Sequence, residues 1–287
     1  MEINWNIENM DTNLTNANVV KSNSMIEASY RLSAQEQRIL LAAISQIQQG
    51  EKVTDQNMYT ISVHDISEIT GLTPRSLYKE LEDAALRLKR REIRIPDEPN
   101  GKGRKAQVLI TCWLQSIQYV PNSGAVQIRF SHDILPYVSQ LTEQFTIYKL
   151  KDVAKLSSSY AIRLYELLMQ WNCTGVRTVE LKWLKSIFLI EDKYPRIKDF
   201  KNRVLEPAIQ QINNTTNLWI EWDQKKTGRK VTHFIFTFGL KNEDKPKKLK
   251  KKPTKSDLQD PKFLSKHGRP GESTPEVIRR LKEQFEI

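Results

Sequence analysis

The sequence is poor in cysteine and has no long apolar run. Its two cysteines, Cys112 and Cys173, lie far apart, which does not suggest a disulfide framework and favours a reducing compartment. No stretch reaches the roughly 18 apolar residues that a membrane-spanning helix needs. The Asn-rich segment from Met1 to Asn18 lacks the apolar centre of a secretory signal. We therefore expect a cytoplasmic protein with no membrane partner.

Signatures of catalysis are also missing. The phosphate-binding pattern Gly-x-x-x-x-Gly-Lys-Ser/Thr does not occur, and Gly101-Lys102-Gly103 lacks its spacing. The histidines are isolated and show no paired metal-binding spacing; they are His64, His132, His233 and His267. The sequence therefore predicts no ATPase activity, no metal site and no cofactor.

One hydroxyl-rich run, Ser157 to Tyr160, has Arg163 close by and invites comparison with a nicking or recombinase tyrosine. Such a tyrosine needs partner groups that activate it and neutralise phosphate charge. Tyr160 instead falls on the apolar stripe of its predicted helix, together with Leu156 and Leu164. Core packing is the favoured interpretation, and we expect that the protein is not an enzyme.

Positive charge is concentrated in the second half of the chain. Of the net +11, residues 1–142 contribute −1, residues 143–240 contribute +6 and residues 241–287 contribute +6. Binding to phosphates releases counterions and so drives a basic surface towards nucleic acid. The alternative is a basic surface that only keeps the protein soluble, and the uneven distribution argues against it.

The first half is expected to begin with a flexible arm, residues 1–30, followed by a helix from Leu32 to Gln49. Ser33 and Glu36 form the capping-box pattern at the start of that helix. The remaining expected elements are a strand at Tyr59–Ser62, a short helix at Val63–Thr70, a long helix from Pro74 to about Arg91, a loop at Asp97–Lys105, and a hairpin of Gln107–Val120 with Ala125–Phe130. A short helix, a Gly-containing turn and a longer helix are typical of a helix-turn-helix.

The second half repeats this order. Its expected elements are a helix at Leu156–Trp171, an extended pair Thr178-Val179, a short helix at Leu181–Ile190, a long helix at Tyr194–Asn213, and strands at Leu218–Trp222 and Val231–Phe238. We interpret the repetition as an α+β fold of two tandem winged helix-turn-helix domains. The expected divisions are the arm 1–30, a first domain 31–142, a second domain 143–240 and a basic tail 241–287.

The long helix of the second half and the basic turn after it carry the candidate DNA-binding residues. In helix-turn-helix proteins the N-terminal part of the second helix meets base edges, and the basic turn Lys225–Lys230 would be the wing. Pro207 should kink or divide the helix because it lacks an N–H group. The candidates are Arg75 and Lys79 in the first domain, and Arg196, Lys198, Lys201, Asn202, Arg203, Lys225, Lys226, Arg229 and Lys230 in the second.

The tail differs from the rest of the chain. Lys245 to Lys255 holds seven lysines and two prolines, a composition typical of a solvated segment. It would either attract DNA without sequence preference or only aid solubility. Ser273-Thr274-Pro275-Glu276 has the chemistry of a helix start. Four apolar residues after it would be available to dock on a partner; they are Val277, Ile278, Leu281 and Phe285.

Two runs carry a family resemblance. Leu150–Leu168, read as LKDVAKLSSSYAIRLYELL, and Asp199–Ala208, read as DFKNRVLEPA, resemble the iteron-binding plasmid replication initiators. Lys226–Lys230, followed by an aromatic strand, adds to the likeness. It extends over about residues 20–240 and is specific in the second half.

The resemblance implies a bacterial, plasmid-encoded protein with two winged-helix domains. It implies binding to directly repeated sites (iterons) in double-stranded plasmid origin DNA as a monomer, in equilibrium with a homodimer that represses its own promoter through an inverted repeat. Opening of an AT-rich segment and recruitment of the host replication initiator and replicative helicase are also implied. So is dimerisation through the first domain, where the hairpin Gln107–Phe130 offers strand edges.

Departures from the family pattern affect both reading helices. The family's basic triplet matches Lys201-Asn202-Arg203, and the central Asn suggests that a different base is read there. The first long helix carries Glu80, Glu82 and Asp83 beside its basic residues, which predicts weaker DNA contacts. A tandem winged-helix repressor without a role in replication is the alternative, because it would share every DNA-binding residue. Direct repeats of about two DNA turns beside the gene would separate the two hypotheses.

Overall fold

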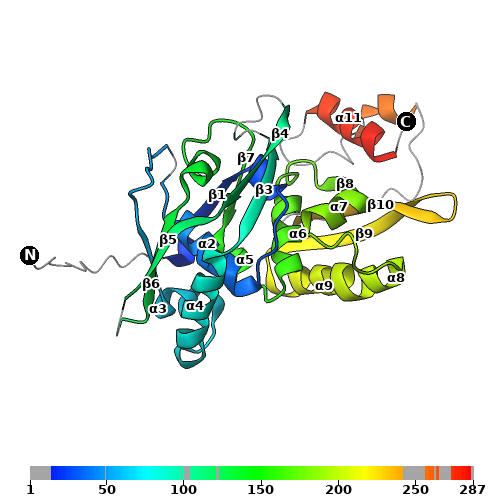
Figure 1. Ribbon diagram of the computed structural model, residues 1–287. Helices are drawn as coiled ribbons and strands as arrows, with labels where there is room; N and C mark the ends of the chain where they lie inside the picture. Colours follow the sequence, from blue (N-terminus) through cyan, green and yellow to red (C-terminus); the bar gives the residue numbers. More distant parts are fainter. Residues whose placement is uncertain are drawn as a thin grey trace, which may run out of the picture.

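The computed structural model describes residues 14–48, 50–97, 99, 104–120, 123–241, 256–261, 263–264 and 273–285. Two three-stranded sheets have the same strand order. In the first half β2 (Tyr59–Ser62), β6 (Ala125–Phe130) and β5 (Leu114–Val120) are bonded in the order β2-β6-β5. In the second half β8 (Val176–Glu180), β10 (Lys230–Leu240) and β9 (Leu218–Thr227) are bonded in the order β8-β10-β9 (Figure 1). The matching topology confirms the internal repeat and the α+β fold.

Helices repeat in the same order. The first half has α2 (Ala34–Ile44), α3 (Val63–Thr70) and α4 (Pro74–Lys89). The second has α6 (Ser159–Met169), α7 (Leu181–Ile187) and an interrupted long helix, α8 (Ile197–Phe200) and α9 (Glu206–Thr215). The predicted capping box is present, since Ser33 Oγ accepts from Glu36 N at 3.2 Å and Glu36 Oε2 accepts from Ser33 N at 2.7 Å. Gly71 ends α3 in the left-handed conformation, with φ 75°.

Helix α2 is buried on all sides because it packs against both α4 and α6. Its charged residues are therefore paired inside the protein, as buried charges must be. Arg38 donates to the carbonyls of Ala154 and Leu156, at 2.8 and 3.1 Å. α2 ends at Ile44 and α6 begins at Ser159, so both helices are shorter than their apolar patterns predicted.

The expectation of a flexible arm is wrong for residues 14–30. After a 3₁₀ turn (Leu14–Asn16), β1 (Asn18–Ser22) pairs antiparallel with β7 (Phe145–Lys149), and α1 (Asn23–Ile26) follows. Residues 1–13 lie outside the described part. The prediction of a flexible arm failed because Lys21 makes β1 look polar in the sequence, although the Lys21 side chain is buried.

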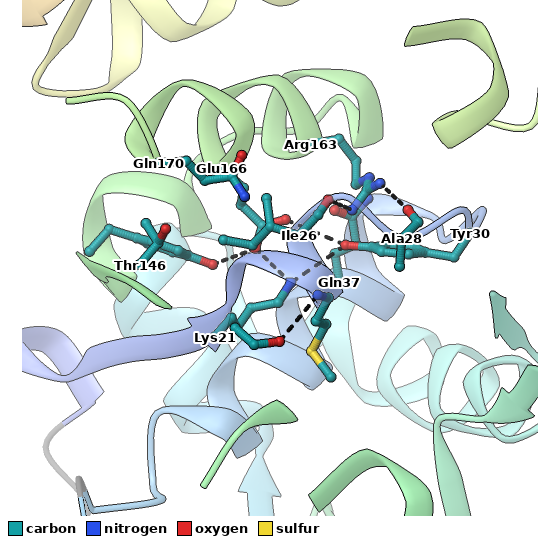
Figure 2. Close-up of polar contacts among 12 residues, drawn as sticks. Lys21, Ile26, Ala28, Tyr30, Gln37, Thr146, Arg163, Glu166 and Gln170 are labelled. Carbon is teal, nitrogen blue, oxygen red and sulfur yellow. Dashed lines mark hydrogen bonds and ion pairs between the residues drawn. The ribbon is translucent and has the colours of Figure 1, made fainter. Parts of the chain in front are cut away.

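Lys21 is neutralised by Glu166 of α6, with Nζ 2.8 Å from Oε1 and both side chains about 1% exposed (Figure 2). The hydroxyls of Tyr148 and Tyr30 also donate to the Glu166 carboxylate. Close by, Arg163 donates to the carbonyls of Ile26 and Ala28, at 2.9 and 2.6 Å. This network ties the N-terminal segment to α6 in the second half.

A further two-stranded sheet joins β3 (Glu92–Asp97) to β4 (Arg104–Cys112). The stretch Gln107–Val120, expected as one arm of a hairpin, is thus divided between two sheets. Trp113 lies at the division; it is fully buried and packs edge-on against Tyr30, with ring centroids 4.9 Å apart. The ends of the expected loop Asp97–Lys105 belong to these strands.

One hydrophobic core runs through both halves, from Leu14 to Phe238. The expected boundary after residue 142 falls directly before β7, which is followed by α5 (Leu150–Ala154). Because β7 is bonded to β1, the joint between the halves is a paired strand. The division into 31–142 and 143–240 stays a prediction. In the part of the chain described here, no helix has the length and apolar character needed to cross a membrane.

The predicted terminal helix is present as α11 (Thr274–Phe285). The expectation that its apolar residues are available to a partner is wrong for Val277 and Leu281. These two are buried in a small separate cluster with Leu258 and Leu264. The lysine-rich run Lys245–Lys255 and the side chain of Phe285 lie outside the described residues.

Candidate nucleic-acid interface

The long helix of the second half is interrupted, as Pro207 predicted. A π turn (Lys201–Leu205) lies between α8 and α9. There the N–H of Glu206 bonds to the carbonyl of Lys201, five residues earlier, and Pro207 follows with no N–H to donate. The helix therefore continues to Thr215 with a changed register instead of ending at the proline.

The inner face of this helix is seated on the sheet behind it. Phe200 stacks on Phe234 of β10, with ring centroids 5.9 Å apart and planes at 19°. Further along the helix, Val204, Ala208 and Ile212 are buried. These contacts fix the outer face of the helix relative to the hairpin that follows.

Both ends of the helix are held by polar contacts. In the turn before it, the ammonium of Lys185 donates to the carbonyls of Lys193 and Tyr194, at 2.9 and 3.0 Å. At its end, Lys241 donates to the carbonyls of Asn213 and Thr216, where the negative end of a helix dipole favours a cation. The helix is thus a rigid element rather than a frayed surface segment.

The predicted reading residues do not all share one environment. Arg196, Lys198, Asn202 and Arg203 are exposed. Lys201 is half-buried, and its Nζ lies 5.5 Å from the centroid of the Trp222 ring on β9. Lys201 therefore reaches towards the hairpin, whereas its two successors in the sequence face solvent.

Four exposed cations line the β9–β10 hairpin, and we call them the wing cations: Lys225, Lys226, Arg229 and Lys230. The turn is tighter than predicted, because β9 extends to Thr227 and β10 begins at Lys230. Gly228, with φ 61°, opens this two-residue turn, a place that favours glycine. The hairpin projects beyond α8 at the right of the view (Figure 1), so the wing cations are carried away from the body of the protein.

The corresponding helix of the first half, α4, has mixed charge. Arg75 and Lys79 are exposed, but so are Glu80, Glu82 and Asp83. α4 and α9 both lie on the lower side of the molecule in Figure 1. The first half thus offers a weaker field for a polyanion than the second.

Sequence reasoning missed Trp222. Trp222 lies two residues after the buried Ile220, so alternation along the strand places it on the side of β9 that faces the helix, and this spacing could have marked it as a candidate. Its contact with Lys201 depends on how distant segments pack and could not be found from the sequence. Trp222 also meets Phe234 edge-on, with ring centroids 5.7 Å apart. Through Phe234 and Phe200 the wing strand and the reading helix share one aromatic cluster.

Tyr160 lacks the environment of a nucleophile. It is half-buried and packs against Phe188, with ring centroids 5.4 Å apart. Burial, together with the neighbouring Tyr194, raises the pKa of Tyr160, whereas a nucleophilic tyrosine needs its phenolate to be favoured. Within the described ranges, no three His, Cys, Asp or Glu side chains gather as metal ligands would.

A short helix, a turn and a long helix packed on a three-stranded sheet with a projecting hairpin define a winged-helix domain, and the chain carries two. The family model described as initiator replication protein, WH1, matches residues 18–169, and that of the WH2 domain matches residues 180–238. The chain belongs to this family and is a plasmid replication initiator.

Two proteins of Escherichia coli and one solved structure are similar to this chain. The chain is 27% identical over 229 residues to an uncharacterized 27.6 kDa protein of Escherichia coli. The matched region covers 76% of this chain and 92% of that protein. It is 25% identical over 233 residues to the PI protein of Escherichia coli, covering 70% and 75% of the two chains. The crystal structure of a Pi initiator protein in complex with iteron DNA has the same fold. Its TM-score is 0.65 at 21% identity, and it covers 80% of this chain and 99% of that one.

Proposed function

We propose that this initiator binds iterons in double-stranded plasmid origin DNA, with the α8–α9 helix in the major groove and the wing on the phosphate backbone. The observation that carries the proposal is the joint placement of Asn202 and Arg203 on the exposed face of a helix whose other face is fixed to the wing strands. The Pi initiator, a structural relative, was solved in complex with iteron DNA, which supports the same ligand here.

Each group has a distinct chemical role in this proposal. The guanidinium of Arg203 can donate two parallel hydrogen bonds to guanine, and the amide of Asn202 can pair with adenine. Arg196, Lys198 and the wing cations sit where phosphates would pass and would fix the register of the protein on the duplex. The second domain, residues 143–240, then supplies most of the sequence preference.

The first domain would make secondary DNA contacts through Arg75 and Lys79. The acidic residues beside them on α4 reduce the attraction to phosphate, so we assign these contacts a smaller share of the binding free energy. A monomer would follow one directly repeated site with both domains, and the paired strands β1 and β7 would hold the two halves in register.

The first domain also offers a surface for a second copy of the chain. Among the described strands, β4 is bonded to β3 alone, and it exposes Val108 and Ile110 at 55% and 57%. An unpaired edge with exposed β-branched residues favours pairing with another strand. We propose that a homodimer formed in this way represses the protein's own promoter through an inverted repeat, while the monomer recruits the host initiator and helicase at the origin.

The test compares Arg203→Ala with the wild-type protein on an iteron duplex and on random DNA. We expect a loss of about 1–3 kcal/mol on the iteron, with relaxed preference at one base pair and little change on random DNA. Gln210→Ala, an exposed change further along the helix, is the matched control and should bind normally. An equal loss on both duplexes would mean that Arg203 only touches phosphate.

The same duplexes separate the initiator from the repressor alternative. An initiator should protect an array of direct repeats at the origin, and a plasmid with the array deleted should fail to replicate even when the protein is supplied. Protection of an inverted repeat alone, with replication unaffected by deletion of the direct repeats, would favour a repressor.

A further inference from the structure

The π turn lies at the part of the helix where bases would be read. Lys201–Leu205 is the only π turn among the described residues, and it contains Asn202 and Arg203. Turns of this kind are rare and often occur at functional sites. The turn holds one more residue than an α-helical turn, so the face that α9 presents is rotated by about 100° relative to an unbroken helix.

Pro207 explains why the turn is present. A proline inside an α-helix donates no hydrogen bond, and its ring clashes with the carbonyl four residues earlier, here that of Arg203. Widening the preceding turn relieves this clash. The helix then resumes with Ala208 buried, so its packing on the sheet is kept.

The turn removes a backbone bond at the reading face. The N–H that would bond to the Asn202 carbonyl in an α-helix belongs to Glu206, which bonds to Lys201 instead. In a longer π-helix the N–H of residue 207 would bond to the Asn202 carbonyl, but residue 207 is proline and has no N–H. The Asn202 carbonyl therefore loses both of these helical hydrogen bonds. A sequence selected for helix stability alone would avoid this loss.

Packing on both sides fixes the turn. Before it, Phe200 is anchored by Phe234, and within it Val204 and Leu205 are both buried. At its first residue the ammonium of Lys201 lies over the ring of Trp222 of the wing strand, where the negative face of the ring attracts a cation. Consequently Lys201 faces the wing, and Asn202 and Arg203 lie next to each other on the solvent side.

We propose that the π turn determines base specificity: Pro207 sustains it, and Trp222 is a positioning residue that holds Lys201 at the junction of helix and wing. The proposal rests on the proposed DNA-binding function and adds which part of the site selects the sequence. In an unbroken α-helix, Asn202 and Arg203 would approach different bases from those they meet here.

Pro207→Ala in the full chain tests the turn, because alanine restores an N–H and favours the α-helix. Binding is measured on the wild-type iteron, on variants with each base pair changed in turn, and on random DNA. We expect the preferred bases opposite Asn202 and Arg203 to change, with a loss of about tenfold on the wild-type site. Affinity for random DNA should stay the same, and Gln210→Ala should leave the whole profile unchanged.

A double-mutant cycle tests Trp222. Trp222→Leu should weaken iteron binding when Lys201 is present and have little further effect in Lys201→Met, because the tryptophan acts through the lysine. Trp222→Phe keeps an aromatic face and should retain most of the affinity. A purely structural role would give equal losses in both backgrounds.

The outcomes separate the two proposals. An unchanged base profile in Pro207→Ala, with sequence-specific binding retained, overturns the role of the turn and leaves the proposed function standing. Additive losses in the cycle overturn the role of Trp222. Failure of the wild-type protein to discriminate the iteron from random DNA would instead contradict the proposed function.

Discussion

The buried pair of Lys21 and Glu166 allows a sharp prediction about stability. Lys21→Met keeps the length and apolar stem of the lysine but removes its charge. The Glu166 carboxylate then stays inside the protein with only the hydroxyls of Tyr148 and Tyr30 as partners. Both charged side chains are about 1% exposed, so water cannot replace the lost ammonium.

The expected loss in the free energy of unfolding is about 3–5 kcal/mol, the range found when one partner of a buried ion pair is removed. The double variant Lys21→Met/Glu166→Gln should recover a large part of it, because an amide oxygen can still accept from Tyr148 and no charge is left buried.

Urea unfolding at pH 7, followed by circular dichroism, measures the effect, with Lys52→Met as a control at an exposed lysine. A change in Lys21→Met of less than about 0.5 kcal/mol, the range of ordinary surface substitutions, would refute the reasoning. So would a double variant no more stable than the single one, because the loss would then come from packing and not from an unpaired charge.

Four further outcomes are expected. Changing all four wing cations to alanine should weaken binding to every duplex and reduce the slope of log affinity against log salt by about 0.9 for each phosphate that the wing no longer neutralises; an unchanged slope would remove the wing from the interface. Burial alone would lower the pKa of Lys21, but the attraction of the Glu166 carboxylate outweighs burial and raises this pKa above 10.5. Burial and the same carboxylate raise the pKa of Tyr148 well above 10.0. Both groups therefore stabilise the fold below about pH 10, and this contribution is lost as pH rises further. Urea unfolding over a pH series measures it, and a decrease in stability already at neutral pH would have another source. Deleting residues 1–30 should unfold part of the protein, seen as lost protection in hydrogen exchange, whereas a true flexible arm could be removed without effect. Ile110→Lys should shift sedimentation towards the monomer and leave iteron binding intact; an unaltered dimer would place the interface elsewhere.

Local signals in the sequence predicted most of the fold. The capping box at Ser33, the apolar stripes of the helices and Gly71 each act within a few residues, so the helices and the repeat could be found. Pro207 likewise marked an interruption of the long helix. The register of that interruption could not be predicted, because it depends on how Phe200 and Ala208 pack on the sheet.

Pairings between distant segments could not be predicted. β1 bonds to β7, more than 120 residues later in the sequence, and Lys21 near the end of β1 hides its apolar pattern. In the candidate site, exposure of Asn202 and Arg203 agrees with their expected position on the helix, while the contact of Lys201 with Trp222 needs the completed hairpin. Their roles in DNA binding stay predictions.

The pairing of β1 with β7 also has a consequence for synthesis on the ribosome. β1 emerges early, but its partner strand and the carboxylate that neutralises Lys21 follow only at residues 145–149 and 166. Until Glu166 has left the exit tunnel, the nascent first domain contains a lysine in its future interior with no counter-charge. Domains generally fold as units in the order of their synthesis, but here the N-terminal half should stay open until the start of the C-terminal half has emerged.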